Sequence, residues 1–301
     1  MDRFEAIRTL LAAIDGGSLS AASRALEVPL STVSRKVSEL EAHLGTQIVV
    51  RTSRKLLLTD AGQAFVAASR RILAELDEAE RAAAGEYQAP RGDLLITAPI
   101  MFGKLHVLPI VLAFLRAYPD VNARLVLADA VVDLLDGQVD VAARLGHLPD
   151  SGLVALRVGE VRWVTCASPD YLAARGTPAT PTELAGHDCI AFEGLRDPRR
   201  WRFGPARDEE GVAIRPRLSV NTADALIEAA AAGFGIARMT SYQAAAAIRA
   251  GRLVTVLRDH VPEPIPVHLV HTGPPLLPLK LRAFLDHAGP RLKAALAALP
   301  D

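Results

Sequence analysis

Apolar residues recur with a helical period through the start of the chain. One helix is predicted from the apolar positions Phe4, Ile7, Leu10, Leu11 and Ile14. Gly16-Gly17 would end this helix, and Ser18 is placed to cap a second one. The second helix should end at Val28-Pro29, because a residue before proline is pushed out of the α region. Two short helices are therefore expected before residue 30.

The next segment predicts a third helix followed by a small hairpin. Ser31 can cap this helix, and Gly45 can end it in a left-handed conformation. Its apolar stripe consists of Val33, Val37, Leu40 and Leu44. Two apolar runs, 47–51 and 55–59, then predict antiparallel strands. Helix, turn, helix and hairpin together indicate a winged helix-turn-helix over residues 1–60.

A long helix should follow, since residues 60–88 contain no proline and are rich in Ala, Glu and Arg. Phe65, Ile72, Leu76 and Ala79 give it one apolar stripe. Such a stripe favours pairing with a second copy of the helix, and the alternative is packing on its own domain. We expect residues 61–89 to form a linker and dimerisation helix.

From residue 90 onwards, strand and helix patterns alternate. Strands are expected at 93–98, 121–128, 139–144, 153–158, 162–166, 189–192, 212–220 and 265–271. Helices are expected at 105–118, 131–135, 222–232 and 241–250, with a last amphipathic helix that contains Leu279, Phe284 and Leu285. This alternation predicts an α/β domain over 90–301 with parallel βαβ units, which could bind a small molecule at the carboxyl ends of its strands.

Charge is balanced over the whole chain but not along it. Lys plus Arg and Asp plus Glu are 34 each, yet residues 31–58 hold five Lys and Arg against two Glu. The third helix turns hydroxyls and cations away from its apolar stripe, a pattern suited to bases in a major groove and to nearby phosphates. We predict that the DNA-binding residues are Ser31, Thr32, Ser34, Arg35, Lys36 and Ser38 on the helix, and Arg51, Thr52 and Arg54 on the wing. Taken alone, the helix face could simply be solvated.

Signals for other classes of protein are weak. The chain has no G-x-S-x-G, phosphate-loop or H-E-x-x-H motif, and Gly233-Phe-Gly235 does not continue as a dinucleotide fingerprint, so no enzyme is indicated. The histidines lack metal spacing, and Cys166 and Cys189 read as small buried hydrophobes rather than redox sensors. No apolar run of about 20 residues and no secretory signal is apparent, which predicts a cytoplasmic protein without a membrane partner.

Two groups of segments follow the pattern of a known family. The first group is SLSAASRALEVPLSTVSRKVSELEAHLG and RTSRKLLLTDAG near the N-terminus. The second is RVGEVRWVTCASPDYLAARGTP, ELAGHDCIAF, VNTADALIEAAAAGFGIA and GRLVTVL. On these segments the sequence resembles the LysR-type transcriptional regulators of bacteria over nearly its whole length. The chain departs from the family at Val49-Val50, where Leu-Phe is usual, and at Leu30, where a polar residue is usual.

The resemblance implies a periplasmic-binding-protein-like C-terminal domain with an effector between two α/β lobes. Residues 92–161 with 266–301 would form one lobe, and 162–265 the other. It also implies a homodimer or homotetramer that binds double-stranded promoter DNA and contacts RNA polymerase. The alternative is a cytosolic small-molecule-binding protein that never touches DNA.

Within those lobes, we expect effector contacts at strand ends and helix starts. The segment after strand 93–98 leads into a helix, whose unpaired N–H groups favour a carboxylate, and Arg144 could hold the same anion. The expected effector-binding residues are Pro99, Ile100, Met101, Phe102, Arg144, Thr165, Ala167, Trp201, Asn221 and Thr222. No cofactor or metal is expected apart from this small-molecule effector.

Overall fold

The computed structural model of the chain describes residues 2–51, 56–83, 89–129, 139–148, 150, 152–194, 197–204, 211–273 and 277–299. The chain divides into two units, Met1–Gln88 and Ala89–Asp301. The elements of the first unit are α1 (Arg3–Asp15), α2 (Leu19–Ala25), α3 (Leu30–Leu44), β1 (Val49–Arg51), β2 (Leu56–Leu58) and α4 (Asp60–Ala83). The predicted loop cations Arg54 and Lys55 lie outside the described residues.

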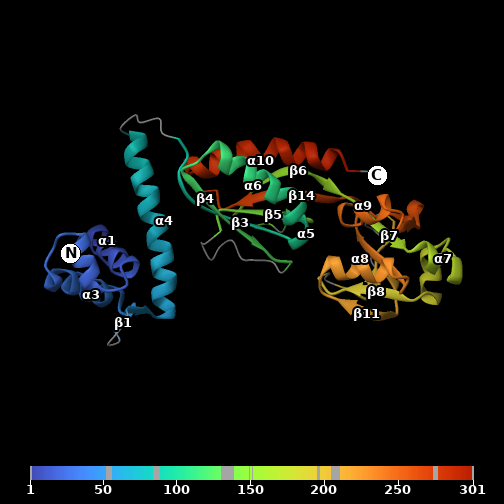
Figure 1. Ribbon diagram of the computed structural model, residues 1–301, viewed down its shortest axis with the longest axis horizontal. Coiled ribbons are helices and arrows are strands. Elements are labelled where there is room, and N and C mark those ends of the chain that lie inside the picture. The colour runs from blue at the N-terminus through green and yellow to red at the C-terminus, as the bar shows by residue number, and fades with distance from the viewer. Residues whose placement is uncertain are drawn as a thin grey trace. The chain divides into compact units, whose positions relative to one another are not determined.

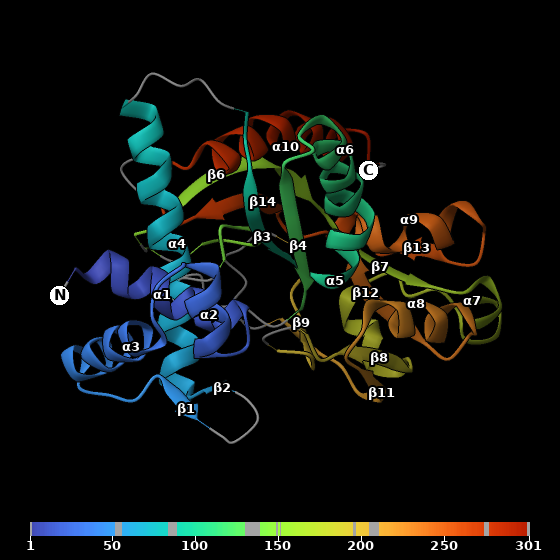
Figure 2. The same cartoon turned by 60° about the vertical axis from the view of Figure 1, so that its left-hand side comes forward.

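Helices α1, α2 and α3 pack together because each has a buried apolar face (Figure 2). Ser18 caps α2 as predicted, since its hydroxyl accepts a hydrogen bond from Ala21 N at 3.1 Å. In α3, Val33 and Val37 are fully buried and Leu40 is 1 % exposed. Burying three such side chains anchors α3 and fixes which face it turns to solvent.

Two details of α3 differ from the prediction. The helix begins at Leu30 rather than after a Ser31 cap, because Pro29 has the extended φ and ψ of an N-cap and its carbonyl accepts from Thr32 N at 2.9 Å. Leu44, predicted to lie in the buried stripe, is 37 % exposed because it is the last residue of the helix, where the chain turns away. The left-handed end at Gly45 is confirmed by its φ of 67°.

The hairpin is present as predicted, with Val49 opposite Leu58 and Val50 opposite Leu57. It leads directly into α4, where the Thr59 hydroxyl accepts a hydrogen bond from Gly62 N at 2.9 Å. A Cβ on Gly62 would lie 2.1 Å from the carbonyl oxygen of Ile48, so only glycine allows this approach between helix and wing.

Helix α4 has both a buried and an exposed apolar side. Val66 and Leu73 are 6 % and 8 % exposed and pack within the first unit, where Arg8 of α1 also pairs with Asp77 at 2.9 Å. Ile72, from the predicted stripe, is 46 % exposed. Phe65, from the same predicted stripe, packs on the core of the first unit, so packing of α4 on its own unit includes part of this stripe and leaves Ile72 exposed.

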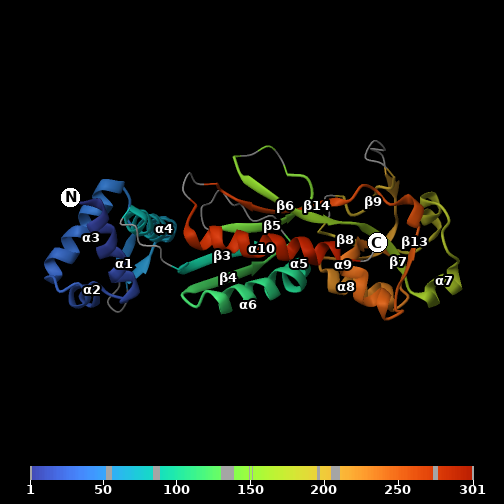
Figure 3. The same ribbon diagram turned by 90° about the horizontal axis from the view of Figure 1, so that it is seen from above.

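The second unit contains two five-stranded sheets in separate lobes (Figures 1 and 3). The first has the order β4-β3-β5-β14-β6, from strands β3 (Gly92–Ala98), β4 (Val121–Leu127), β5 (Val141–Leu145), β6 (Val154–Val161) and β14 (Ile265–His271). The second has the order β11-β8-β12-β7-β13, from strands β7 (Trp163–Ala167), β8 (Cys189–Phe192), β11 (Pro216–Val220), β12 (Ile236–Thr240) and β13 (Val254–Val256).

Each sheet is parallel where βαβ units were predicted and antiparallel where the chain crosses between lobes. Strand β3 runs parallel to β4 and β5, whereas β14 runs antiparallel to β5 and β6. The chain leaves the first sheet between β6 and β7 and returns to it at β14. Strand β14 arrives from the other lobe and therefore enters the sheet from the opposite end. The prediction of parallel strands is thus confirmed for the βαβ units alone.

Helices cover the sheets on both lobes. They are α5 (Ile100–Phe102), the π-helical turn η1 (Gly103–Val107), α6 (Leu108–Ala117), α7 (Pro169–Arg175), α8 (Ala223–Ala231), α9 (Ser241–Arg249) and α10 (Leu279–Ala297), with 3-10 turns η2 (Pro181–Gly186) and η3 (Arg258–His260). Helix α7 and both 3-10 turns were not predicted. The expected helix at 131–135 lies outside the described residues, and the expected strand 212–220 is divided into β10 (Val212–Ala213), which pairs with β9 (Arg200–Trp201), and β11.

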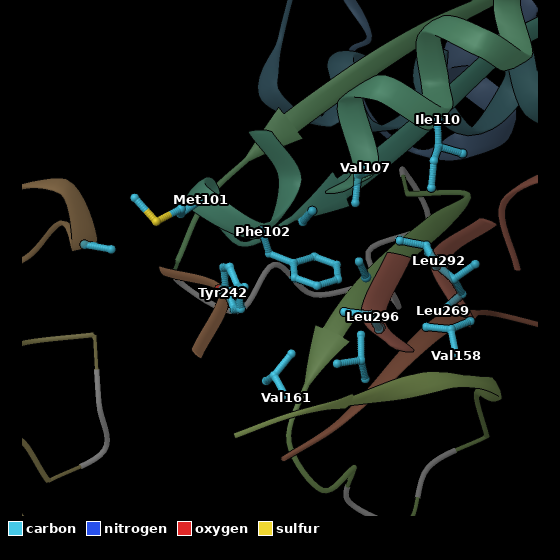
Figure 4. Packing of buried hydrophobic residues seen from close by; sticks show 14 of the residues in the cluster. Met101, Phe102, Val107, Ile110, Val158, Val161, Tyr242, Leu269, Leu292 and Leu296 are labelled. Atoms are coloured by element: carbon cyan, nitrogen blue, oxygen red, sulfur yellow. The ribbon is translucent and has the colours of Figure 1, made fainter. Parts of the chain in front are cut away.

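One apolar core joins the first sheet to its helices (Figure 4). The ring of Phe102 points into the cluster that contains Leu292 and Leu296 of α10, and Met101 points to the other side of its short helix (Figure 4). By length and composition alone the helical run Ile100–Ala117 could cross a membrane, with a mean hydropathy of 1.7. Its side chains Phe102 and Phe114 are fully buried in this core, as in a helix that covers a sheet.

Candidate functional site

The solvent-exposed face of α3 carries short polar side chains and one arginine. Ser31, Arg35 and Ser38 are exposed, and Thr32 and Ser34 are half-buried beside them. The side chain of Arg35 is 64 % exposed, and its Nη1 atom lies 2.9 Å from Glu39 Oε1 on the next turn. An exposed pair of this kind is weak, so Arg35 can exchange its partner for another anion at little cost.

Lys36 differs from Arg35 in both exposure and direction. Its side chain is only 15 % exposed, and its ammonium pairs with Glu5 of α1. The two neighbouring cations therefore have different surroundings: Arg35 lies with the exposed serines, and Lys36 ties α3 to α1. The side chain of Arg51 is not described, and Thr52 and Arg54 lie outside the described residues.

A carboxylate holds the start of the hairpin against α3. Glu41 Oε1 accepts hydrogen bonds from Ile48 N at 2.9 Å and from Val49 N at 3.1 Å. Both donors belong to nearly buried residues that would otherwise lack an acceptor for these N–H groups. Glu41 thus ties the start of the hairpin to α3, in addition to the apolar packing of Ile48 and Val49 in the core of the first unit, and the sequence pattern did not reveal this role.

In the second unit, a cavity of about 460 Å³ opens between the two sheets, at the carboxyl ends of their parallel strands. Its size is that of a small-molecule site. The first lobe and the returning crossover contribute Pro99, Asp129, Leu145, Gly146, His147 and residues 262–266. The second lobe contributes Trp163, Phe192, Gly194, Arg202, Phe203, Gly204, Arg238, Met239, Thr240, Tyr242 and Gln243.

Among the predicted effector residues, Pro99 lines this cavity. The helix start beside it already has an acceptor, because Asp129 Oδ1 accepts from Ile100 N at 3.0 Å. The Asp129 carboxylate thus accepts from an N–H group at the helix start, where the sequence predicted that an effector carboxylate would bind. Met101 and Phe102 are 9 % and 0 % exposed in the core, where the Phe102 ring lies 5.5 Å from that of Tyr242 on α9.

The other predicted effector residues are not part of the lining of this cavity. Thr165, Ala167 and Trp201 are buried in the second lobe, at 6 %, 0 % and 2 % exposure. Asn221 is exposed, and the Thr222 hydroxyl caps α8 by accepting from Ala225 N at 3.4 Å. Arg144 is half-buried on β5 and is not part of the cavity lining. Their contact with an effector stays a prediction.

The most distinctive cavity residue, Arg238, was missed by the sequence reading. It is 6 % exposed, and its guanidinium carbon lies 4.9 Å from the ring centre of Trp163 and 5.0 Å from that of Phe203. Burial lowers the pKa of Arg238 to about 10, which still leaves it protonated at neutral pH. The signal was available, since one cation stands in the otherwise uncharged strand IARMT.

Both thiols are buried, and burial raises the pKa of Cys166 and of Cys189 to about 12. A neutral thiol is a poor nucleophile, so neither side chain is activated for chemistry. Among the described residues, no group of three or more His, Cys, Asp or Glu side chains could hold a metal ion.

Comparison with known proteins agrees with both halves of the molecule. The family model for the lysR family of bacterial regulatory helix-turn-helix proteins matches residues 4–63, and the LysR substrate binding domain matches residues 87–293. The HTH-type transcriptional regulator CrgA of Neisseria meningitidis serogroup C is 32 % identical over 284 residues, which cover 94 % of this chain and 94 % of that protein. An HTH-type transcriptional regulator of Xanthomonas campestris is 34 % identical, over 93 % of this chain and 82 % of the relative.

Solved structures show the same architecture. The structure of CrgA from Neisseria meningitidis matches with a TM-score of 0.61 and 30 % identity, over 96 % of this chain and 98 % of that one. Full-length AphB, a virulence activator of Vibrio cholerae, matches with a TM-score of 0.58 and 26 % identity, over 95 % and 98 % of the two chains.

The winged helix-turn-helix and the two-lobed domain together define a DNA-binding transcriptional regulator with an effector-binding domain. The chain belongs to the LysR family of transcriptional regulators. Its fold class and its regulatory function are confirmed as predicted, and the alternative of a binding protein without DNA contact is not favoured, because the helix-turn-helix match covers residues 4–63. The family consists of regulators rather than enzymes.

Proposed function

We propose that α3 enters the major groove of promoter DNA and that the wing lies beside it. The observation that carries this proposal is the division of α3 into a buried face, with Val33 and Val37, and an exposed face with Ser31, Arg35 and Ser38. Hydroxyls and a guanidinium are the groups that read base edges and contact phosphates. On the helix, Thr32, Ser34 and Lys36 would flank this face. On the wing, Arg51, Thr52 and Arg54 would contact the backbone.

Two copies of the chain would pair through residues 61–88, so that two reading helices face half-sites about one helical turn apart or a multiple of it. The exposed Ile72 on α4 supports this pairing, since it is a large apolar side chain that the packing of α4 on its own unit leaves uncovered. Two such dimers would form a tetramer that works in the cytoplasm and contacts RNA polymerase. Residues 1–60, 61–89 and 90–301 then act as reading domain, linker and effector domain.

The cavity between the lobes would receive the small-molecule effector. Its lining comes from both sheets and from the crossover at residues 262–266, so a ligand there touches both lobes at once. A ligand that contacts two parts of a domain favours the arrangement in which both contacts are made. Effector binding would thereby shift the balance between two oligomer arrangements and change how promoter DNA is held.

DNA reading is tested by Arg35→Ala in the full-length protein. Duplexes selected from a random pool by the parent protein would serve as targets, and binding would be measured over a range of salt concentrations. We expect affinity to fall by about 1–3 kcal/mol and, if Arg35 contacts phosphate, the salt dependence to become shallower by about one ion.

The matched control is Arg8→Ala, which removes another exposed, ion-paired arginine from the same unit. It should leave the affinity and the salt dependence as in the parent. Equal binding by the Arg35→Ala variant and the parent would show that α3 is not the reading helix. A parent protein that selects no duplex would refute DNA reading altogether.

A further inference from the structure

Arg238 has an unusual place for a cation. It stands on a central strand of the second sheet, 6 % exposed, among the residues that line the cavity between the lobes. Its Nε atom is buried without a hydrogen-bond partner among the described residues. An uncompensated buried charge is costly, and proteins usually remove that cost with an ion pair.

Two aromatic rings offset part of this cost without satisfying the N–H donors. The guanidinium carbon of Arg238 lies over Trp163 at 4.9 Å and over Phe203 at 5.0 Å. A ring face attracts the cation, but it has no lone pair in position to accept the in-plane N–H groups. The rings therefore flank the guanidinium group but supply no acceptor, and its Nε–H stays without a hydrogen-bond partner among the described residues. Arginine in such a stacked setting is suited to bidentate contact with a carboxylate.

The charges that line the cavity are separated between the lobes. Arg202 and Arg238 belong to the second lobe, whereas Asp129 belongs to the first and Glu263 to the returning crossover. Asp129 is already engaged with Ile100 N at 3.0 Å. An anion is thus favoured at the second-lobe end and disfavoured at the other.

The remaining lining is mostly apolar. Leu145, Phe192, Met239 and Ile265 belong to it, together with the rings of Trp163 and Phe203. Apolar walls suit a ligand with one charged group and an uncharged body, and they disfavour an ion such as phosphate, which needs donors on every side.

We infer that the effector is a small carboxylate with an apolar body, and that Arg238, which contacts the rings of Trp163 and Phe203, binds its carboxyl group. This inference rests on the proposed function, because it assigns the ligand class and the anchoring residue of the same cavity. It places the anion on the second lobe, away from the helix start and from Arg144, where the sequence alone had placed it.

The test uses the full-length protein and three pairs of probes: benzoate with benzamide, phenylacetate with phenylacetamide, and hexanoate with hexanamide. Each probe is added at roughly 10 mM, and thermal unfolding of the second unit is followed, since a ligand of the folded state raises its midpoint. At least one carboxylate should stabilise the parent protein, and its matched amide should not. Inorganic phosphate at the same concentration should have no such effect.

Substitutions then locate the anchor. Arg238→Gln should weaken binding of the active carboxylate at least about tenfold by calorimetry, and Arg238→Lys should retain part of the affinity, because the charge is kept and the fork is lost. Arg217→Gln is the matched control: Arg217 also stacks on a ring, Phe234 at 5.4 Å, but its side chain is 62 % exposed and is not part of the cavity lining. Arg217→Gln should bind the carboxylate like the parent.

Several outcomes would overturn the inference. They are no stabilisation by any of the three carboxylates, equal stabilisation by the amides, a response to phosphate alone, or full binding by a folded Arg238→Gln variant. Loss of binding in Arg202→Gln with retention in Arg238→Gln would move the anchor to Arg202. Duplex binding without ligand is measured in parallel. A protein that binds duplex but no carboxylate refutes this inference alone, and a protein that binds no duplex refutes the proposed function.

Discussion

Replacing Glu41 by alanine should loosen the wing from the reading helix and destabilise the first unit. The Glu41 side chain accepts from Ile48 N and Val49 N, at 2.9 and 3.1 Å, and these donors belong to residues that are 1 % and 4 % exposed. Leaving two such N–H groups without an acceptor costs about 2–3 kcal/mol in total, with allowance for the half-exposed position of Glu41. For a unit of this size, that corresponds to a fall in Tm of roughly 10–15 °C.

The two units can be followed separately in one sample. Both tryptophans, Trp163 and Trp201, belong to the second unit, so tryptophan fluorescence reports on that unit alone. Circular dichroism also records the helices of the first unit. We expect Glu41→Ala to move a helical transition to lower temperature while the fluorescence transition stays in place. Glu41→Gln, which keeps an acceptor oxygen but loses the charge, should cost about 1 kcal/mol.

Glu39→Ala is the control for the loss of a carboxylate from the same helix. Glu39 pairs with Arg35 on the surface, and such pairs contribute about 0.5 kcal/mol or less. The reasoning about Glu41 would be wrong if Glu41→Ala and Glu39→Ala had equal effects. It would also be wrong if Glu41→Gln were as damaging as Glu41→Ala.

Three further outcomes are expected. Glu39→Gln should tighten binding to a selected duplex about two- to fivefold at low salt, because Arg35 loses its competing anion, and unchanged or weaker binding in a titration would contradict this. Cys166 and Cys189, whose pKa burial raises to about 12, should not react with a thiol reagent at pH 8 until denaturant is added, so rapid labelling of the folded protein would count against their burial. Burial lowers the pKa of His271, so the unfolded chain binds a proton at a higher pH than the folded chain does. The free energy of unfolding of the second unit should therefore fall as the pH drops below about 6.5. His271→Asn should make the urea midpoint less dependent on pH, and an unaltered dependence would contradict this assignment.

The first unit could be predicted closely because its signals are local. The spacing of Val33, Val37 and Leu40 determines which face of α3 is buried, and Gly45 has the conformation that its position at the helix end requires. The prediction failed at the start of α3, where Pro29 is the N-cap without a side-chain hydrogen bond and Ser31 lies within the first turn. A periodic pattern does not define the end of a helix to within one or two residues.

The cavity was less accessible to sequence reasoning, because its residues are distant along the chain. Pro99, Trp163, Phe203 and Arg238 come together only when both sheets have formed and the crossover has returned. The sequence pointed to strand ends, and of the residues it predicted there Pro99 lines the cavity. It could not indicate that Asp129 would engage the start of the helix at Ile100, because that bond depends on the order of strands in the sheet.

The position of β14 has a consequence for synthesis on the ribosome. This strand lies between β5 and β6 in the first sheet, yet it is made after every strand of the second sheet. The second lobe can therefore close while translation is still under way, and the first lobe must wait with β5 and β6 apart until residues 265–271 emerge. A nascent chain that stalls before this point would expose the unpaired inner edges of β5 and β6, and it would depend on chaperones for as long as the stall lasts.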